Sequence, residues 1–207
     1  MNKIIRILTI LVVIFISGCK LEPSLKNDFN LTIDDFIMNQ FSDDGQKLYT
    51  IISPKSNLNK ITQIYELDTV KIIFFENDIP EYIVTADSAI LNNNILTLDG
   101  NVLIEDIDNM GGFIKSNILY WDVNNELITL EGDVKLDDDY INLSSSKAIL
   151  NQDSDVVKFY NPVKYSYKVS SSNTNFRVSS ENAFYDFNSN KMLFSSEGER
   201  VRSTLYF

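Results

Sequence analysis

The chain has 207 residues and carries 18 Lys and Arg against 29 Asp and Glu, which gives a net charge of −11. This acidic balance argues against a nucleic-acid-binding protein. The lack of His and the single Cys exclude His-based catalysis, an internal disulfide framework and a CxxC site. With 7 Gly, 4 Pro and 44% hydrophobic residues, the sequence is typical of a folded chain, either one domain or one elongated repeat array.

The first segment, residues 1–18, is predicted to be a lipoprotein signal peptide. Two basic residues precede an apolar run over residues 7–16, which is shorter than the roughly 20 residues needed to span a bilayer. Ile16-Ser17-Gly18-Cys19 resembles a bacterial lipobox, so Cys19 is the expected lipidation site and residues 19–30 the expected lipidated tether. A plain signal peptide or a short uncleaved anchor, with Cys19 incidental, is the alternative.

From residue 31 to residue 207, alternation of apolar and polar residues predicts an all-β domain. The clearest predicted strands are residues 71–75, 82–86, 95–104 and 127–136. Clusters of Asn and Asp separate the strands, among them Asn92-Asn93-Asn94 and Asn124-Asn125. Because Asn and Asp suit tight turns, the pattern predicts a series of β-hairpins.

The predicted hairpins repeat about every 30 residues. Residues 84–92 align with residues 114–122 and 178–186, and more loosely with residues 143–151. The strands that follow carry Gly100 and Gly132 at equivalent places, which predicts a bulge or bend there. Equivalent valines are expected to be Val70, Val102, Val134, Val163 and Val201. Such a period predicts stacked copies of one unit, which could form a sandwich, a solenoid or an open jelly roll.

Alternation also assigns one face of each strand to the interior and the other to solvent. Thr97 and Glu131 are expected on the outer face. The inward candidates for a lipid-lined groove are Val84, Ala86, Leu98, Val102, Ile104, Ile114, Trp121, Leu130, Val134 and Leu136. A packed core uses the same residue types, so the pattern leaves core and groove open. A register error of one residue would exchange the two faces.

Three motifs resemble the LptC family of lipopolysaccharide-transport proteins. Residues 35–49 resemble its opening strand, acidic-Gly turn and second strand. The Ala-x-x-Ala-x-Leu strand from Ala86 to Leu91 and the Leu-x-Gly-x-Val strands around Gly100 and Gly132 resemble repeats that LptC shares with LptA and the periplasmic part of LptD. The resemblance covers about residues 36–163, and the tail to residue 207 continues the repeat pattern.

This resemblance implies an open, twisted antiparallel β-jelly roll of stacked hairpins over residues 31–207, whose apolar interior carries the acyl chains of lipopolysaccharide. It implies two partners: an inner-membrane ABC transporter that supplies the lipid, and an LptA-like bridge protein that receives it by edge-strand pairing. The edge candidates are residues 31–41 and 201–207, although the last four residues could equally be a frayed terminus.

The implied location is the periplasmic side of the inner membrane, with the chain anchored there by a lipid on Cys19. Lys20 leaves the outer membrane open as an alternative. Because lipid A is anionic like this chain, binding would come mainly from acyl-chain burial, about 0.8 kcal/mol per CH₂. The lysines considered for headgroup contacts, which more often form a solvated face, are Lys115, Lys135, Lys158 and Lys164.

Catalysis is not expected, and neither is a cofactor or a metal. The carboxylates of residues 137–139 and of Glu197 and Glu199 match no Ca²⁺ loop and are expected by chance in an acidic chain. The main rival hypothesis is a structural or adhesive β-solenoid lipoprotein with no lipid cavity. An LptA-like bridge is a second rival, against which the lipid anchor argues.

Overall fold

The computed structural model describes residues 29–107, 112–137, 141–151, 154, 156–168, 175–186, 189, 191–198 and 200–206. The predicted signal peptide, Cys19 and the tether up to residue 28 lie outside the described residues. Within them the strands are β1 (Asn30–Phe41), β2 (Lys47–Asn59), β3 (Ile64–Glu76), β4 (Ile79–Asn92), β5 (Ile95–Asp106), β6 (Phe113–Asp122), β7 (Leu127–Asp137), β8 (Ile141–Asn151), β9 (Val156–Lys168), β10 (Asn175–Asp186), β11 (Lys191–Ser195) and β12 (Arg202–Tyr206).

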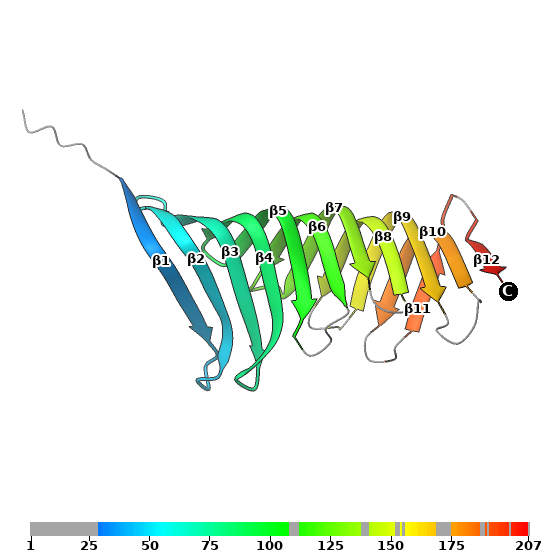
Figure 1. Cartoon of the computed structure of the whole chain (residues 1–207), viewed down its shortest axis with the longest axis horizontal. Helices are drawn as coiled ribbons and strands as arrows, with labels where there is room; N and C mark the ends of the chain where they lie inside the picture. Colours follow the sequence, from blue (N-terminus) through cyan, green and yellow to red (C-terminus); the bar gives the residue numbers. More distant parts are fainter. Residues whose placement is uncertain are drawn as a thin grey trace, which may run out of the picture.

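These strands form a single antiparallel sheet in which β1 to β11 pair in chain order and β12 pairs with β10. Figure 1 shows them stacked along the long axis, with β1 at one end and β10 to β12 at the other. The four clearest predicted strands lie inside β3, β4, β5 and β7. Alternating residues and Asn-rich turns therefore located these hairpins correctly.

Each long strand bends near its middle. In β5 and β7 the bend falls at Gly100 and Gly132, whose φ angles of +79° and +76° lie in the left-handed region that favours glycine. The residues that follow, Asn101 and Asp133, also have positive φ, and the pairing register shifts there. The predicted bulges at the two glycines are confirmed.

Four even-numbered strands, β2, β6, β8 and β10, bend at a buried or half-buried serine. The repeat alignment did not predict a role for this serine. In β2, β6, β8 and β10 the hydroxyl of this serine donates to the backbone carbonyl two residues later. The pairs are Ser53 with Lys55 (2.6 Å), Ser116 with Ile118 (3.1 Å), Ser145 with Lys147 (3.1 Å) and Ser180 with Asn182 (2.8 Å). In β4 the aligned residue is Ala86. The hydroxyl satisfies a carbonyl that the bend removes from regular pairing.

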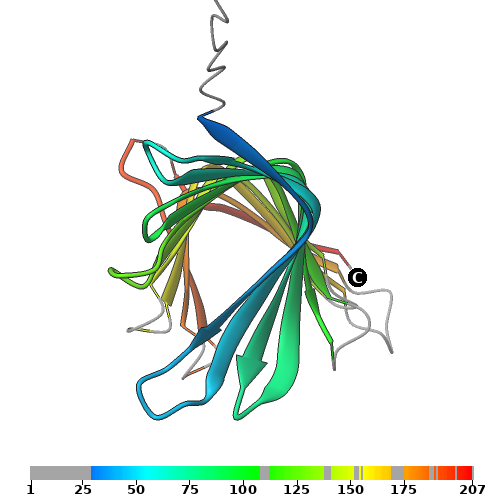
Figure 2. The ribbon, with the colours of Figure 1, turned by 90° about the vertical axis from the view of Figure 1, so that its left-hand side faces the viewer.

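The bends fold the sheet over so that the two halves of each strand lie in two facing walls (Figure 2). Wall A carries the turns that follow Phe41, Glu76 and Asp106, and wall B carries the turns that follow Asn59 and Asn92 and their later counterparts. Aromatic rings meet across the interior. Trp121 of wall B lies 4.9 Å from Tyr49 and 5.0 Å from Phe74 of wall A, between ring centroids. The predicted fold class, an open twisted antiparallel jelly roll, is confirmed.

The last edge of the sheet is one strand broken at its bend. β9 occupies one side of β10 along its length, so β11 and β12 share the other side, opposite the second and first halves of β10 respectively. At the break, the carboxylate of Glu181 accepts hydrogen bonds from the backbone N–H groups of Glu197 and Gly198. Residues 202–206 therefore pair with β10 and do not fray.

The valine repeat ends at this break. Val70, Val102, Val134 and Val163 are fully buried, one on each successive odd-numbered strand. Val201 is 42% exposed and lies before β12. The expectation that it is the fifth equivalent valine is wrong, because the residues that join β11 to β12 leave the ladder.

Candidate functional site

The structure places all ten predicted groove residues between the two walls. Leu98 and Val134 have exposed fractions of 0%. The others that are buried are Val84, Ala86, Val102, Trp121 and Leu130, and those that are partly buried against them are Ile104, Ile114 and Leu136. Thr97 and Glu131, which were expected on the outer face, are less buried than the inward residues next to them. The predicted register and faces are therefore correct, while lipid contact by these residues stays a prediction.

Most of the described interior is packed. Buried apolar side chains from β1 to β10 form one contiguous cluster. A pocket of about 160 Å³, lined by both apolar and amide side chains, lies at the β1 end of the interior.

This pocket, here called the Trp121 pocket, lies between the two walls. Its lining residues are Met38, Gln40, Tyr49, Ile51, Leu91, Asn93, Asn94, Leu96, Trp121 and Val123. Trp121 is only 6% exposed, and its Nε1–H has no hydrogen-bond partner among the described residues. A buried donor without a partner loses its hydrogen bonds to water and gains none in return. The indole N–H of Trp121 is therefore an unsatisfied buried donor.

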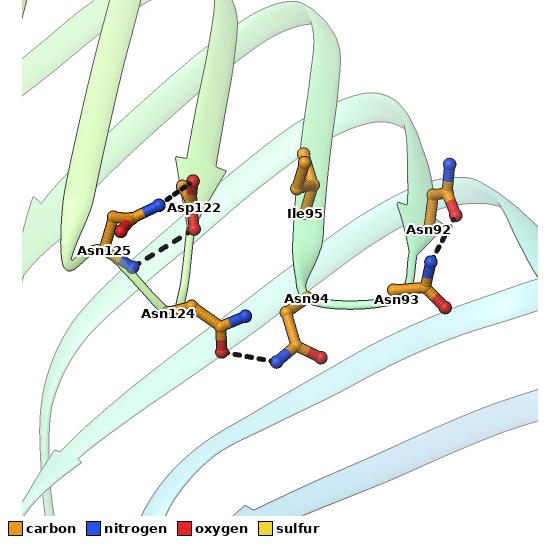
Figure 3. A pocket seen from close by; sticks show the side chains of 7 residues that line it. All are labelled: Asn92, Asn93, Asn94, Ile95, Asp122, Asn124 and Asn125. Carbon is orange, nitrogen blue, oxygen red and sulfur yellow. Dashed lines mark hydrogen bonds between the residues drawn. The ribbon is translucent and has the colours of Figure 1, made fainter.

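A second pocket, here called the amide pocket, lies on the turns of wall B and has a volume of about 390 Å³. Its lining residues are Asn92, Asn93, Asn94, Ile95, Asp122, Asn124 and Asn125 (Figure 3). Asn94 donates from Nδ2 to Asn124 Oδ1, and Asn125 donates from its backbone and its side chain to the carboxylate of Asp122. The hydrogen bonds from Asn125 lower the pKa of Asp122 from its ordinary value.

The two pockets adjoin, because Asn93 and Asn94 line both. The β4–β5 and β6–β7 turns are also joined by a backbone hydrogen bond of 3.0 Å from Val123 N–H to Asn94 C=O. Together the pockets form one recess, whose rim on the wall B turns carries side-chain amides and the carboxylate of Asp122. Sequence reasoning used these Asn clusters only as turn signals and missed their clustering in space.

Three of the four candidate lysines fall on one outward row of the sheet. Lys115 on β6 pairs directly with Lys135 on β7. Lys135 in turn pairs with Ser144 on β8, and Ser144 pairs with Lys164 on β9, so the row continues across these four strands. Lys158 lies on the other wall. Asp133 and Asp137 stand two residues to either side of Lys135. The acidic neighbours interrupt the row, which is typical of a solvated face and forms no continuous basic surface.

Tyr82 lies near the start of β4, opposite Phe74 of β3 and Asp106 of β5. Burial, together with the carboxylates of Glu81, Asp106 and Glu76, raises the pKa of Tyr82 to about 12. An unfolded tyrosine ionises near pH 10, so between about pH 10 and 12 the unfolded state releases this proton first. The free energy of unfolding is therefore expected to fall as the pH rises through this window.

The Tyr82→Phe variant tests this alkaline dependence. It should lose less stability than the parent chain between pH 9 and pH 11.5, because the phenol that resists ionisation is gone. Urea unfolding followed by circular dichroism at the two pH values measures the difference. If the variant and the parent chain lose the same free energy of unfolding between these pH values, Tyr82 does not contribute to the alkaline dependence.

Of the expected carboxylate groups, Asp137 and Glu197 are described, whereas Asp138, Asp139 and Glu199 lie outside the described residues. Within the described part of the chain, no group of three or more His, Cys, Asp or Glu is placed to hold a metal ion. In the same part, no helix has the length and apolar character needed to cross a membrane.

A family model, "LptC: Lipopolysaccharide-assembly, LptC-related", matches residues 4–168, which is most of the chain. The chain belongs to the LptC family. The match ends at the last residue of β9, so β10 to β12 lie beyond it. The LptC family is a component of lipopolysaccharide transport, its members are periplasmic, and it is not an enzyme family.

Among solved structures, the chain is similar to LptH from Pseudomonas aeruginosa, the LptA-homologous periplasmic component of the lipopolysaccharide transport device. The two chains share 15% sequence identity, with 61% of this chain and 94% of LptH covered and a TM-score of 0.48. No curated protein sequence matches the chain.

Proposed function

We propose that this LptC-family protein takes lipopolysaccharide from an inner-membrane ABC transporter and passes it between walls A and B toward the outer membrane. The observation that carries the proposal is the inward apolar face, which continues from β1 to β10 in a chain of this family. The protein carries lipid and performs no chemistry on it. Acyl chains would gain about 0.8 kcal/mol per CH₂ by leaving water.

Access for lipid requires the two walls to separate at their turns. Along the described part of the chain, the walls are joined by the bends and meet across the interior only through side chains. Strands pair with their chain neighbours, apart from β12 with β10, and none pairs across the opening. Aromatic contacts, such as that between Tyr49 and Trp121, connect the two walls in the interior. Separating the walls would expose apolar side chains to water, which costs free energy. An acyl chain between the walls covers these side chains again, so its burial offsets that cost.

The two ends of the sheet are proposed as docking edges. Among the described strands β1 pairs only with β2, so one side of its backbone has no partner strand within the described part of the chain, and Ile37 on it is 63% exposed. The opposite end is formed by the broken β11 and β12. A partner strand from the transporter or from an LptA-like bridge protein would satisfy the unpaired backbone groups and continue the apolar interior across subunits.

The anchor belongs to the same proposal. Residues 1–18 are removed as a signal peptide, Cys19 carries the lipid, and a tether to residue 30 leads to the jelly roll on the periplasmic side of the inner membrane. The described residues begin one residue before β1, which starts at Asn30. A lipid at Cys19 would keep the β1 edge near the membrane that holds the transporter.

The packed interior supports a second candidate, a structural or adhesive β-lipoprotein that binds no lipid inside. Thermal unfolding separates the two. A ligand present at one hundred times its dissociation constant stabilises the folded state by about 2.7 kcal/mol. We therefore expect lipopolysaccharide to raise the unfolding temperature of the purified full chain, and phosphatidylcholine vesicles to leave it unchanged. An unfolding temperature that ignores lipopolysaccharide would favour the structural candidate.

A further inference from the structure

The amide pocket presents unused hydrogen-bonding atoms to one space. Each of its five asparagines uses one side-chain amide atom in a hydrogen bond and leaves the other without a partner among the described residues. The unused acceptors are the Oδ1 atoms of Asn93, Asn94 and Asn125, and the unused donors are the Nδ2 groups of Asn92 and Asn124. Ile95, which is 50% exposed, adds an apolar surface among them.

The adjoining Trp121 pocket supplies an independent observation. The buried Nε1–H of Trp121 has no partner within the described part of the chain, and Trp121 lines a space of about 160 Å³ together with the apolar side chains of Met38, Ile51, Leu91 and Leu96. That volume is below the 300–1,000 Å³ of typical small-molecule sites, whereas the amide pocket, at about 390 Å³, is within that range. The recess therefore suits part of an apolar chain whose polar head occupies the amide pocket.

We propose that the two pockets form one site for an acylated saccharide, with sugar hydroxyls on the amides of Asn93, Asn94 and Asn124 and part of an acyl chain beside Trp121. This proposal rests on the proposed function and adds to it a recognition site for the sugar.

The chemistry of the rim favours sugar hydroxyls over phosphates. A hydroxyl both donates and accepts, which matches a rim that presents amide donors and acceptors together. A phosphate only accepts, and it would meet the charged carboxylate of Asp122 with no lysine or arginine in the lining. The exposed Ile95 can pack against the C–H face of a sugar ring.

Trp121 is the sole tryptophan of the chain, so its fluorescence reports on this pocket without a label. The full chain in phosphatidylcholine vesicles is titrated with lipopolysaccharide that carries its core sugars, and separately with palmitate, which has an acyl chain and no sugar. The test variant is Asn94→Ala/Asn124→Ala, in which neither residue has positive φ. The control is Thr32→Ala/Asn57→Ala, which also removes a hydrogen bond between side chains but lies on β1 and β2 away from the pocket.

In the test variant we expect lipopolysaccharide to bind about tenfold more weakly, as for the loss of two hydrogen bonds, with palmitate binding unchanged. The control variant should bind both probes like the parent chain. Unchanged lipopolysaccharide affinity in the test variant, or an equal loss for palmitate, would overturn the sugar site. If lipopolysaccharide raises the unfolding temperature but leaves Trp121 fluorescence unchanged, this site alone is wrong. If lipopolysaccharide changes neither the unfolding temperature nor the Trp121 fluorescence, the proposed function is wrong as well.

Discussion

Replacing Gly132 with alanine is expected to lower the free energy of unfolding by roughly 2 to 4 kcal/mol. The φ of +76° at this bend disfavours any residue with a Cβ. The added Cβ would also lie 2.7 Å from Nδ2 and 3.0 Å from Cβ of Asn117 on β6. Backbone strain and steric overlap therefore act together: the Asn117 amide must rotate away, and its Cβ must move by a few tenths of an ångström.

Gly45→Ala is the matched control, because Gly45 has a similar φ of +86° but nothing within 4 Å of an added Cβ. It should show the backbone strain alone, about 1 to 2 kcal/mol. In the Gly132→Ala background, Asn117→Gly should recover part of the loss by removing the overlapping atoms. Chemical denaturation measures all four proteins. An effect of Gly132→Ala no larger than that of Gly45→Ala would refute the close packing of the bends.

Leu98→Ala is expected to lower the free energy of unfolding by about 2 to 5 kcal/mol, because Leu98 is fully buried and its truncation leaves a cavity between the walls. An apolar cavity of this kind stays dry and accepts an apolar ligand. If the interior is the lipid path, lipopolysaccharide should stabilise this variant at least as much as it stabilises the parent chain.

Thr97→Ala, one residue away on the outer face, is the control for Leu98→Ala and should change stability by less than about 1 kcal/mol. Urea denaturation with and without lipopolysaccharide provides both readouts. A small effect of Leu98→Ala would contradict the packing of the interior. Loss of the lipopolysaccharide response in a folded Leu98→Ala protein would contradict the role of this interior in carrying lipid.

Alternation along the chain was enough to predict the faces of the strands. Because side chains alternate strictly in a strand, Leu98 and Thr97 had to lie on opposite faces once the register was known. The turn clusters gave the register, and Gly100 and Gly132 marked the bends, since glycine tolerates the left-handed conformation that a bulge requires. The family motifs then selected the jelly roll among the architectures that stacked hairpins can form.

Other features depend on distances that a sequence pattern does not contain. The bend serines form short local hydrogen bonds, and β2 supplies a copy at Ser53 that the repeat alignment did not include. The break between β11 and β12 removed Val201 from the repeat, because Glu181 binds the backbone at residues 197 and 198 and the chain leaves the ladder there. The adjoining pockets arise from turns about 30 residues apart in sequence, Asn94 and Asn124, which only the folded sheet brings together.

Site-specific photocrosslinking to lipopolysaccharide in cells tests the central claim most directly. The photoreactive residue is placed at the inward positions Leu98, Leu130 or Trp121, and at the outward positions Thr97 or Glu131 as matched neighbours. Lipid between the walls predicts crosslinks at the inward positions and none at the outward ones. Absence of crosslinks at every position, in cells where the protein is folded and lipid flux is confirmed, would contradict the account and favour a structural β-lipoprotein with a filled core.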